Sequence, residues 1–123
     1  MIISAIDWMD LAYHEGTVTV SDGIHTVNCF FSGGADETLV CGQALTEPLH
    51  FLDVQDIMRS EYPFPSIRPL GDSPWAVRLC GCLSEDRQQL QVGGLCFNLQ
   101  DTPLPGDIQG SEWIFCTAER IDL

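Results

Sequence analysis

The strongest structural signal in the sequence is a β-hairpin over residues 17–31. Its centre, Asp22-Gly23, is a favoured pair for a two-residue type I′ turn, in which both central residues need a positive φ. With this turn, Val20 is expected to pair with His25. Because side chains alternate between the two faces of a strand, one face of the hairpin is apolar and is expected to join the core. That face holds Val18, Val20, Val27, Cys29 and Phe31.

The same alternation, interrupted by turn residues, continues along the chain. It predicts strands near residues 2–7, 16–20, 24–31, 38–45, 76–83, 88–92, 95–100 and 112–121. Asp53 as an N-cap, with Asp56 in the favourable first turn, predicts one short helix near residues 53–60. Strands do not alternate with long helices, so the expected fold class is all-β. Residues 1–123 are expected to form a single β-barrel domain.

Residues 59–75 interrupt this pattern with four of the seven prolines in the chain. A proline lacks the backbone N–H donor and restrains the residue before it, so we expect neither a helix nor a central strand here. The segment also contains Tyr62, Phe64 and Trp75, which make it too apolar for a solvated linker. We therefore predict a long ordered loop packed on the body of the protein, and loops of this length are often functional.

Three segments of the second half resemble the oligonucleotide/oligosaccharide-binding fold (OB-fold). Residues 77–83 place Gly81 in the middle of a strand, residues 90–97 form a strand, a tight turn and a strand, and residues 105–115 lead from a glycine-containing loop into an apolar strand. The resemblance covers about 45 residues, within 76–121. It implies a small, closed or partly open antiparallel β-barrel. The usual ligand of such a barrel is a nucleic acid strand, bound by aromatic stacking in a cationic groove.

The charge of the chain argues against that ligand. Eighteen acidic residues stand against five arginines and no lysine, for a net charge of −13, and nine of the acids precede Arg59, the first cation other than histidine. Such a surface repels phosphate backbones and anionic lipid, so we expect neither nucleic acid nor membrane as a partner. It attracts basic proteins instead. The lack of lysine also excludes Schiff-base and phosphate-loop chemistry.

The cysteines and histidines predict no reactive centre. The N-terminus lacks the basic start and cleavage site of a signal peptide, so we expect a cytoplasmic protein with reduced cysteines that act as small apolar residues. A zinc site could use four of them, but the Cys-x-Cys spacing differs from that of structural zinc sites. These four are Cys80, Cys82, Cys96 and Cys116. None of the three histidines adjoins a cysteine. We predict no metal, no cofactor and no catalytic residue.

These observations favour a non-catalytic, acidic binding module that docks on a basic protein, one version being an inhibitor or immunity-type protein that presents carboxylates in place of phosphates. Carboxylates at strand ends and turns, with apolar anchors from the proline-rich loop, are the predicted contacts: Asp7, Asp10, Asp22, Asp36, Glu37, Tyr62, Phe64 and Trp75. Two alternatives stay open. One is a small-ligand binder or an enzyme with its site under residues 59–75, and the other is an atypical single-stranded nucleic-acid binder. The acidity could also serve solubility alone.

Overall fold

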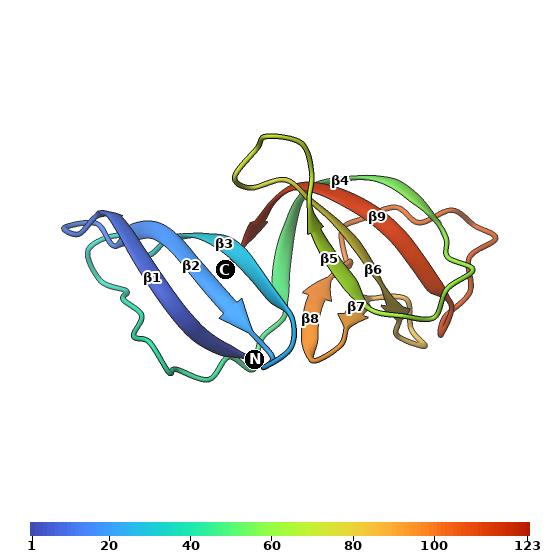
Figure 1. Cartoon of the computed structure of the whole chain (residues 1–123), viewed down its shortest axis with the longest axis horizontal. Helices are drawn as coiled ribbons and strands as arrows, with labels where there is room; N and C mark the ends of the chain where they lie inside the picture. The colour runs from blue at the N-terminus through green and yellow to red at the C-terminus, as the bar shows by residue number, and fades with distance from the viewer.

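The computed structural model describes all 123 residues, which form nine β-strands and no α-helix (Figure 1). The structure therefore contains no helix long and apolar enough to cross a membrane. The all-β fold class is confirmed. In chain order the strands are β1 (Ile2–Asp10), β2 (Glu15–Ser21), β3 (Thr26–Ser32), β4 (Leu49–Arg59), β5 (Ser66–Pro69), β6 (Val77–Leu83), β7 (Gln89–Val92), β8 (Leu95–Asn98) and β9 (Trp113–Asp122).

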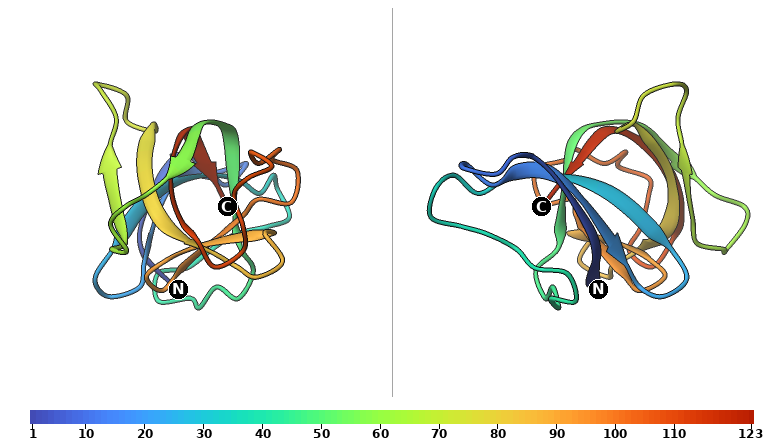
Figure 2. Two further views of the ribbon diagram at one scale, coloured as in Figure 1. Left: turned by 90° about the vertical axis from the view of Figure 1, so that its right-hand side faces the viewer. Right: turned by 60° about the vertical axis from the view of Figure 1, so that its left-hand side comes forward.

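Five of the strands close into a small barrel, on the right of Figure 1. Around the ring, β4 pairs with β8, β8 with β7, β7 with β6, β6 with β9, and β9 with β4 again. All of these pairs are antiparallel except β4 with β8, which is parallel. The closed barrel is consistent with the resemblance to the OB-fold. β5 pairs only with β6 and lies outside the ring, at the margin of the barrel (Figure 2, left).

The first three strands form an antiparallel sheet beside the barrel, on the left of Figure 1. β3 joins this sheet to β9 through a short parallel pairing of Cys29 with Ile121 and Phe30 with Asp122. Nineteen buried apolar residues, drawn from the sheet and from the barrel, make one continuous core. Val18 and Val20 therefore pack in the same cluster as Phe97 of the barrel.

The predicted hairpin is present, but its register differs by two residues. Val20 pairs with Val27 instead of His25, so the turn spans residues 22–25. The prediction of a type I′ turn is wrong, because among residues 22–25 only Gly23 has a positive φ, of 97°. A shift of two residues leaves every side chain on its original face. The predicted apolar face is therefore buried: Val18, Val20, Val27, Cys29 and Phe31.

The helix predicted at residues 53–60 is wrong, because this segment belongs to β4. Asp53 and Asp56 have left-handed φ values of 58° and 55°, and the pairing with β9 slips by one residue between Gln55 and Met58. Aspartate is among the few residues that adopt this conformation readily, and such a residue breaks the two-residue alternation of a strand. The half-buried apolar residues then recur at every third position, a spacing that also suggests a helix: Phe51, Val54 and Ile57.

Two further expectations about the strands need correction. Residues 38–45 are a loop with one isolated bridge, from Ala44 to Ile2, and backbone hydrogen bonds tie it along the start of β1. Conversely, the proline-rich segment contains a strand, β5. Proline is tolerated there because Pro69 ends an edge strand, where one side of the backbone has no neighbouring strand to bond.

Candidate functional site

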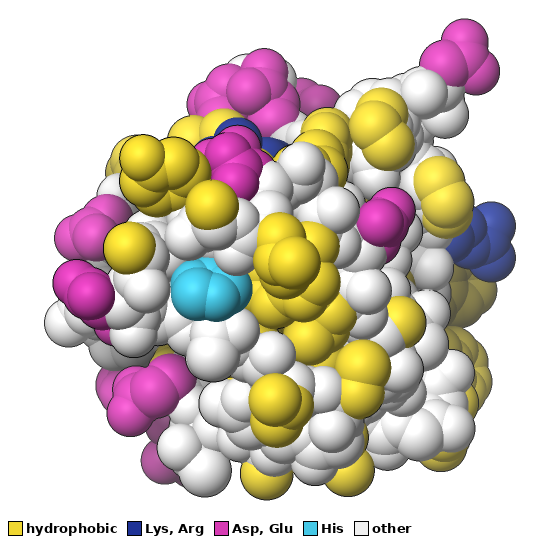
Figure 3. Space-filling view, turned by 90° about the vertical axis from the view of Figure 1, so that its left-hand side faces the viewer, with side chains coloured by type: hydrophobic (Ala, Val, Ile, Leu, Met, Phe, Trp, Pro, Cys, Tyr) yellow, Lys and Arg dark blue, Asp and Glu magenta, His cyan; other side chains and the backbone are white.

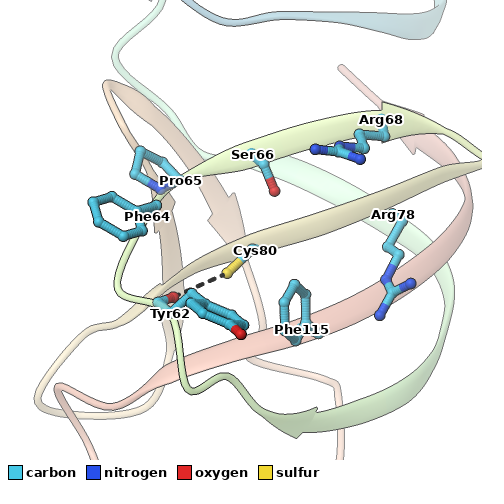
Figure 4. A pocket seen from close by; sticks show the side chains of 8 residues that line it. All are labelled: Tyr62, Phe64, Pro65, Ser66, Arg68, Arg78, Cys80 and Phe115. Carbon is cyan, nitrogen blue, oxygen red and sulfur yellow. Dashed lines mark hydrogen bonds between the residues drawn. The ribbon is translucent and has the colours of Figure 1, made fainter.

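A cavity of about 460 Å³ opens on the outer surface of the barrel, where residues 62–65 pass in front of β6 and β9 (Figure 4). Tyr62 and Phe64 stand at its edge, with 65% and 68% of their surface exposed to solvent. We call this site the arginine–aromatic groove. Its lining is Tyr62, Phe64, Pro65, Ser66, Arg68, Arg78, Cys80 and Phe115.

Strand register brings most of this lining together. Across the β5–β6 ladder, Ser66 is opposite Cys80 and Arg68 is opposite Arg78. Phe115 of β9 is opposite Cys80 on the other side of β6. Because every second residue of a strand faces the same way, these five side chains share the outer face of the sheet.

The segment that leads into β5 is held over this face by hydrogen bonds. The hydroxyl of Ser60 donates to the carbonyl oxygen of Tyr62 at 2.9 Å, and the Tyr62 N–H donates back to that hydroxyl at 3.1 Å. The thiol of Cys80 lies 3.5 Å from the Ser60 hydroxyl and 3.8 Å from the Tyr62 carbonyl oxygen. Cys80 is therefore buried beneath this segment and not in the barrel core, which places Tyr62 at the mouth of the groove.

The groove holds two cations without counter-charges. Arg59 forms ion pairs with Asp107 and Glu112, and Arg120 pairs with Asp122. Arg87 donates a hydrogen bond to the carbonyl oxygen of Pro105. The guanidinium groups of the other two arginines in the chain, Arg68 and Arg78, make neither an ion pair nor a hydrogen bond within the protein.

Arg78 lies against an aromatic ring and extends the groove along β9. Its guanidinium carbon is 4.9 Å from the centroid of the Phe115 ring, a cation–π contact. Arg78 and Phe115 also line an adjoining cavity of about 290 Å³ with Met58, Leu70 and Asp56. Asp56 is the one carboxylate there, and it forms no ion pair with Arg78.

The structure divides the predicted contact residues between separate surfaces. Tyr62 and Phe64 lie in the arginine–aromatic groove, but Trp75 does not. The Trp75 ring packs edge-on against Phe30 of β3, with 6.0 Å between ring centroids, and so joins the β5–β6 connection to the N-terminal sheet. The remaining predicted contacts are carboxylates of the N-terminal sheet and its loops. Four of them lie at the opposite end of the molecule from residues 62–65, namely Asp7, Asp10, Asp36 and Glu37, whereas Asp22 lies beside the barrel (Figure 1).

Asp22 differs from the other predicted carboxylates. Its side chain is only 8% exposed, so it is not the solvent-facing contact that its position in a turn suggested. It accepts backbone hydrogen bonds from Ile24, His25 and Gly94 at 2.8, 2.6 and 2.7 Å, and lies 3.1 Å from Nδ1 of His25. Burial alone would raise the pKa of Asp22, but these donors outweigh it and hold the pKa well below its ordinary value. Asp22 thus connects the β2–β3 turn to the turn between β7 and β8.

The two arginines that define the groove, Arg68 and Arg78, are not among the contact residues predicted from the sequence. Arg78 alternates with Val77 and Leu79, so its outward position could have been predicted. Arg68 was hidden in the proline-rich segment, and its position opposite Arg78 depends on a pairing that no local pattern contains. The alternation around Arg78 was therefore the one signal in the sequence that could have located part of the groove.

The lining of the groove offers guanidinium donors, aromatic faces, the hydroxyls of Tyr62 and Ser66 and the thiol of Cys80, and it contains no histidine or carboxylate. Elsewhere, burial raises the pKa of the Cys29 and Cys116 thiols to about 12, and no three His, Cys, Asp or Glu side chains are placed to hold a metal ion. Comparisons of the chain with family models, with curated proteins and with solved structures found no match.

Proposed function

We propose that this protein is a non-catalytic binding module and that its main binding site is the arginine–aromatic groove. The observation that carries this proposal is the pair of exposed aromatic side chains, Tyr62 and Phe64, at the mouth of a cavity of about 460 Å³. Sites for small molecules are typically concave and largely apolar, with a few polar groups that orient the ligand. The groove has this composition, since half of its eight lining residues are apolar.

The two tyrosines of the chain provide a matched test of this site. Tyr62 and Tyr13 are exposed to a similar extent, 65% and 62%, but Tyr13 follows β1 at the other end of the molecule. We expect Tyr62→Ser to weaken binding of small aromatic molecules on the order of tenfold, because the contact between the tyrosine ring and the ring of the ligand is lost. Tyr13→Ser should leave binding unchanged.

The measurement is a titration of the ¹⁵N-labelled protein with a set of small neutral and acidic aromatic molecules. Binding in the groove should shift the amide signals of residues 62–66, 78–80 and 115 in ¹H–¹⁵N correlation spectra. Shifts that cluster elsewhere, or equal affinities for Tyr62→Ser and Tyr13→Ser, would show that the groove is not the binding site.

A second candidate function is docking of the acidic N-terminal end on a basic protein. Four of the predicted carboxylates are exposed there, and none forms an ion pair: Asp7, Asp10, Asp36 and Glu37. Figure 3 shows this end of the molecule, with acidic side chains along its rim, apolar side chains between them and few cationic ones. Charges in such a rim act mainly on the association rate and on its salt dependence.

Neutralising these four carboxylates together, as Asn or Gln, is expected to slow association with a heptalysine peptide at low salt several-fold, because the field that steers the peptide to this end comes mainly from the charges located there. The measurement is stopped-flow association at two ionic strengths. A control variant neutralises four other exposed acids that form no ion pair: Asp72, Glu85, Asp101 and Glu119. Equal slowing in both variants would mean that only the net charge acts, and that this end is no docking surface.

A further inference from the structure

We propose that the arginine–aromatic groove binds a small aromatic molecule that carries an oxyanion, a carboxylate or a phosphate, held between Arg68 and Arg78. This inference rests on the proposed function, since it names the ligand class of the same site. Two observations carry it. Arg68 and Arg78 are opposite each other and have no ion-pair partner, and they lie at the other end of the cavity from its two exposed aromatic side chains (Figure 4).

The two arginines repel each other when no anion is bound, although both side chains are exposed and solvent keeps the cost of this repulsion small. Residues directly opposite in an antiparallel ladder have Cβ atoms about 4.5–5.5 Å apart, and like charges at such positions destabilise the pair. Arg68 and Arg78 occupy such positions, in a chain with 18 acidic residues that could have neutralised them. A bound oxyanion would remove the repulsion and satisfy both groups.

Guanidinium groups fit this ligand better than other cations do. Each presents a planar set of N–H donors that matches the two oxygens of a carboxylate or a phosphate. The N–H groups of Arg78 are available to a ligand, because its guanidinium group contacts the Phe115 ring and makes no hydrogen bond or ion pair within the protein. Both side chains reach the site from rigid strands, β5 and β6.

The other end of the groove selects for an aromatic or apolar group. In Figure 4, Tyr62, Phe64 and Pro65 lie at one end and the two arginines at the other, with Ser66, Cys80 and Phe115 between them. The cavity of about 460 Å³ lies in the range of small-molecule sites, about 300–1,000 Å³. A ligand with an aromatic ring at one end and an oxyanion at the other would contact both parts of the lining.

A nucleic acid strand fits the same surface poorly. A strand needs a row of cations along its backbone, which supplies most of the affinity. The groove has two, and the guanidinium groups of the other three arginines already have partners within the protein. The charge pattern therefore suits one isolated anionic group and not a polymer of them.

The experiment compares benzoate and phenyl phosphate with benzyl alcohol, which keeps the ring and lacks the charge, and with inorganic phosphate, which lacks the ring. Affinities for the full chain are measured by NMR titration at low salt. We expect both aromatic anions to bind about tenfold or more tightly than benzyl alcohol and than inorganic phosphate. Binding should weaken when the ionic strength is raised from about 0.02 M to about 0.5 M, because the groove is open to solvent.

Single-residue variants then locate the anion. Arg68→Gln and Arg78→Gln are each expected to reduce the affinity for phenyl phosphate about tenfold or more, while their affinity for benzyl alcohol stays the same. Arg120→Gln is the matched control, because it removes the same charge outside the groove, and it should change the affinity less than about twofold. Thermal unfolding at low salt separates loss of binding from misfolding. The Arg68 variant should unfold at the wild-type temperature or above it, since a repulsion is removed. The Arg78 variant should unfold close to the wild-type temperature, because the lost contact with the Phe115 ring offsets the same gain.

The outcomes separate this inference from the proposed function. If benzyl alcohol binds in the groove as tightly as the anions, the groove is a binding site and the anionic ligand class is wrong. If inorganic phosphate binds as tightly as phenyl phosphate, the aromatic part of the inference is wrong. If a single-stranded oligothymidine binds more than about tenfold tighter than phenyl phosphate and depends on Arg68, the ligand is a polymer and the inference fails. If no probe binds in the groove, both proposals fail.

Discussion

Replacing Gly81 with alanine is expected to lower the free energy of unfolding by about 3 kcal/mol, because the barrel has no room for the added methyl group. Gly81 lies in the middle of β6, between β7 and β9 in the barrel wall. A Cβ atom built there would be 2.4 Å from the carbonyl oxygen of Gln91 and 2.8 Å from Cγ2 of Val92. The backbone of β7 would have to move away from β6, and the ring of strands would open.

Urea unfolding followed by tryptophan fluorescence measures this loss. Gly106→Ala is the matched control, because Gly106 has no atom within 4 Å of the new methyl group and no positive φ. Its free energy of unfolding should stay within about 1 kcal/mol of the wild type, with any change towards higher stability, because alanine restricts the unfolded chain. If the two variants unfold at the same urea concentration, β6 and β7 do not approach each other as closely as the structure shows.

The second large effect is expected at Asp22, where substitution by alanine should cost about 3 kcal/mol. The carboxylate accepts hydrogen bonds from three backbone N–H groups in two different turns. Alanine would leave the N–H of Gly94 without its partner and would separate the β2–β3 turn from the turn between β7 and β8. Gly93 and Gly94 come so close to the Asp22 side chain that a Cβ at either position would lie within 2.8 Å of it.

This contribution should depend on pH in a defined direction. The pKa of Asp22 is lowered in the folded protein from an ordinary value of 3.8, so the unfolded state binds a proton first as the pH falls. The stabilisation is then complete above about pH 4 and is lost progressively below it. Asp22→Ala should therefore differ from the wild type most at neutral pH, and the difference should shrink towards pH 2.

Chemical unfolding at several pH values between 2 and 7 tests this dependence. Asp36→Ala is the control, because Asp36 is exposed and forms no ion pair or side-chain hydrogen bond. Its effect on the free energy of unfolding should be small. A loss at Asp22 that stays constant down to pH 2 would mean that the charge of the carboxylate does not stabilise the fold.

Local patterns predicted the strands well where one face is buried. In the β2–β3 hairpin the two-residue alternation identified the core face correctly, even though the register was displaced by two residues. Gly81 in the middle of a predicted strand indicated a tight barrel, and the closed ring confirms it. Burial of one face is a local property of a strand, so a single sequence can reveal it.

The secondary-structure predictions were wrong where the backbone departs from regular strand geometry or contains proline. Left-handed φ values at Asp53 and Asp56 gave β4 the apolar spacing of a helix. Residues 66–69 were expected to be part of a loop because of the prolines around them. They form an edge strand that ends at Pro69, because proline is excluded only from central strands. At both places a local signal had two structural solutions, and the pairing with a distant strand selected one of them.

The sequence by itself therefore determined the class of the fold, the apolar faces of its strands, and a charge that disfavours nucleic acid. Only the tertiary structure decided that Tyr62 and Phe64 lie apart from the acidic end, that the Asp22 side chain is shielded from solvent, and that Arg68 is opposite Arg78. The physical reason is that side-chain alternation depends on neighbours along the chain. The groove depends instead on β5, β6 and β9, whose register is set by hydrogen bonds between residues as far apart in the sequence as Val77 and Ala118.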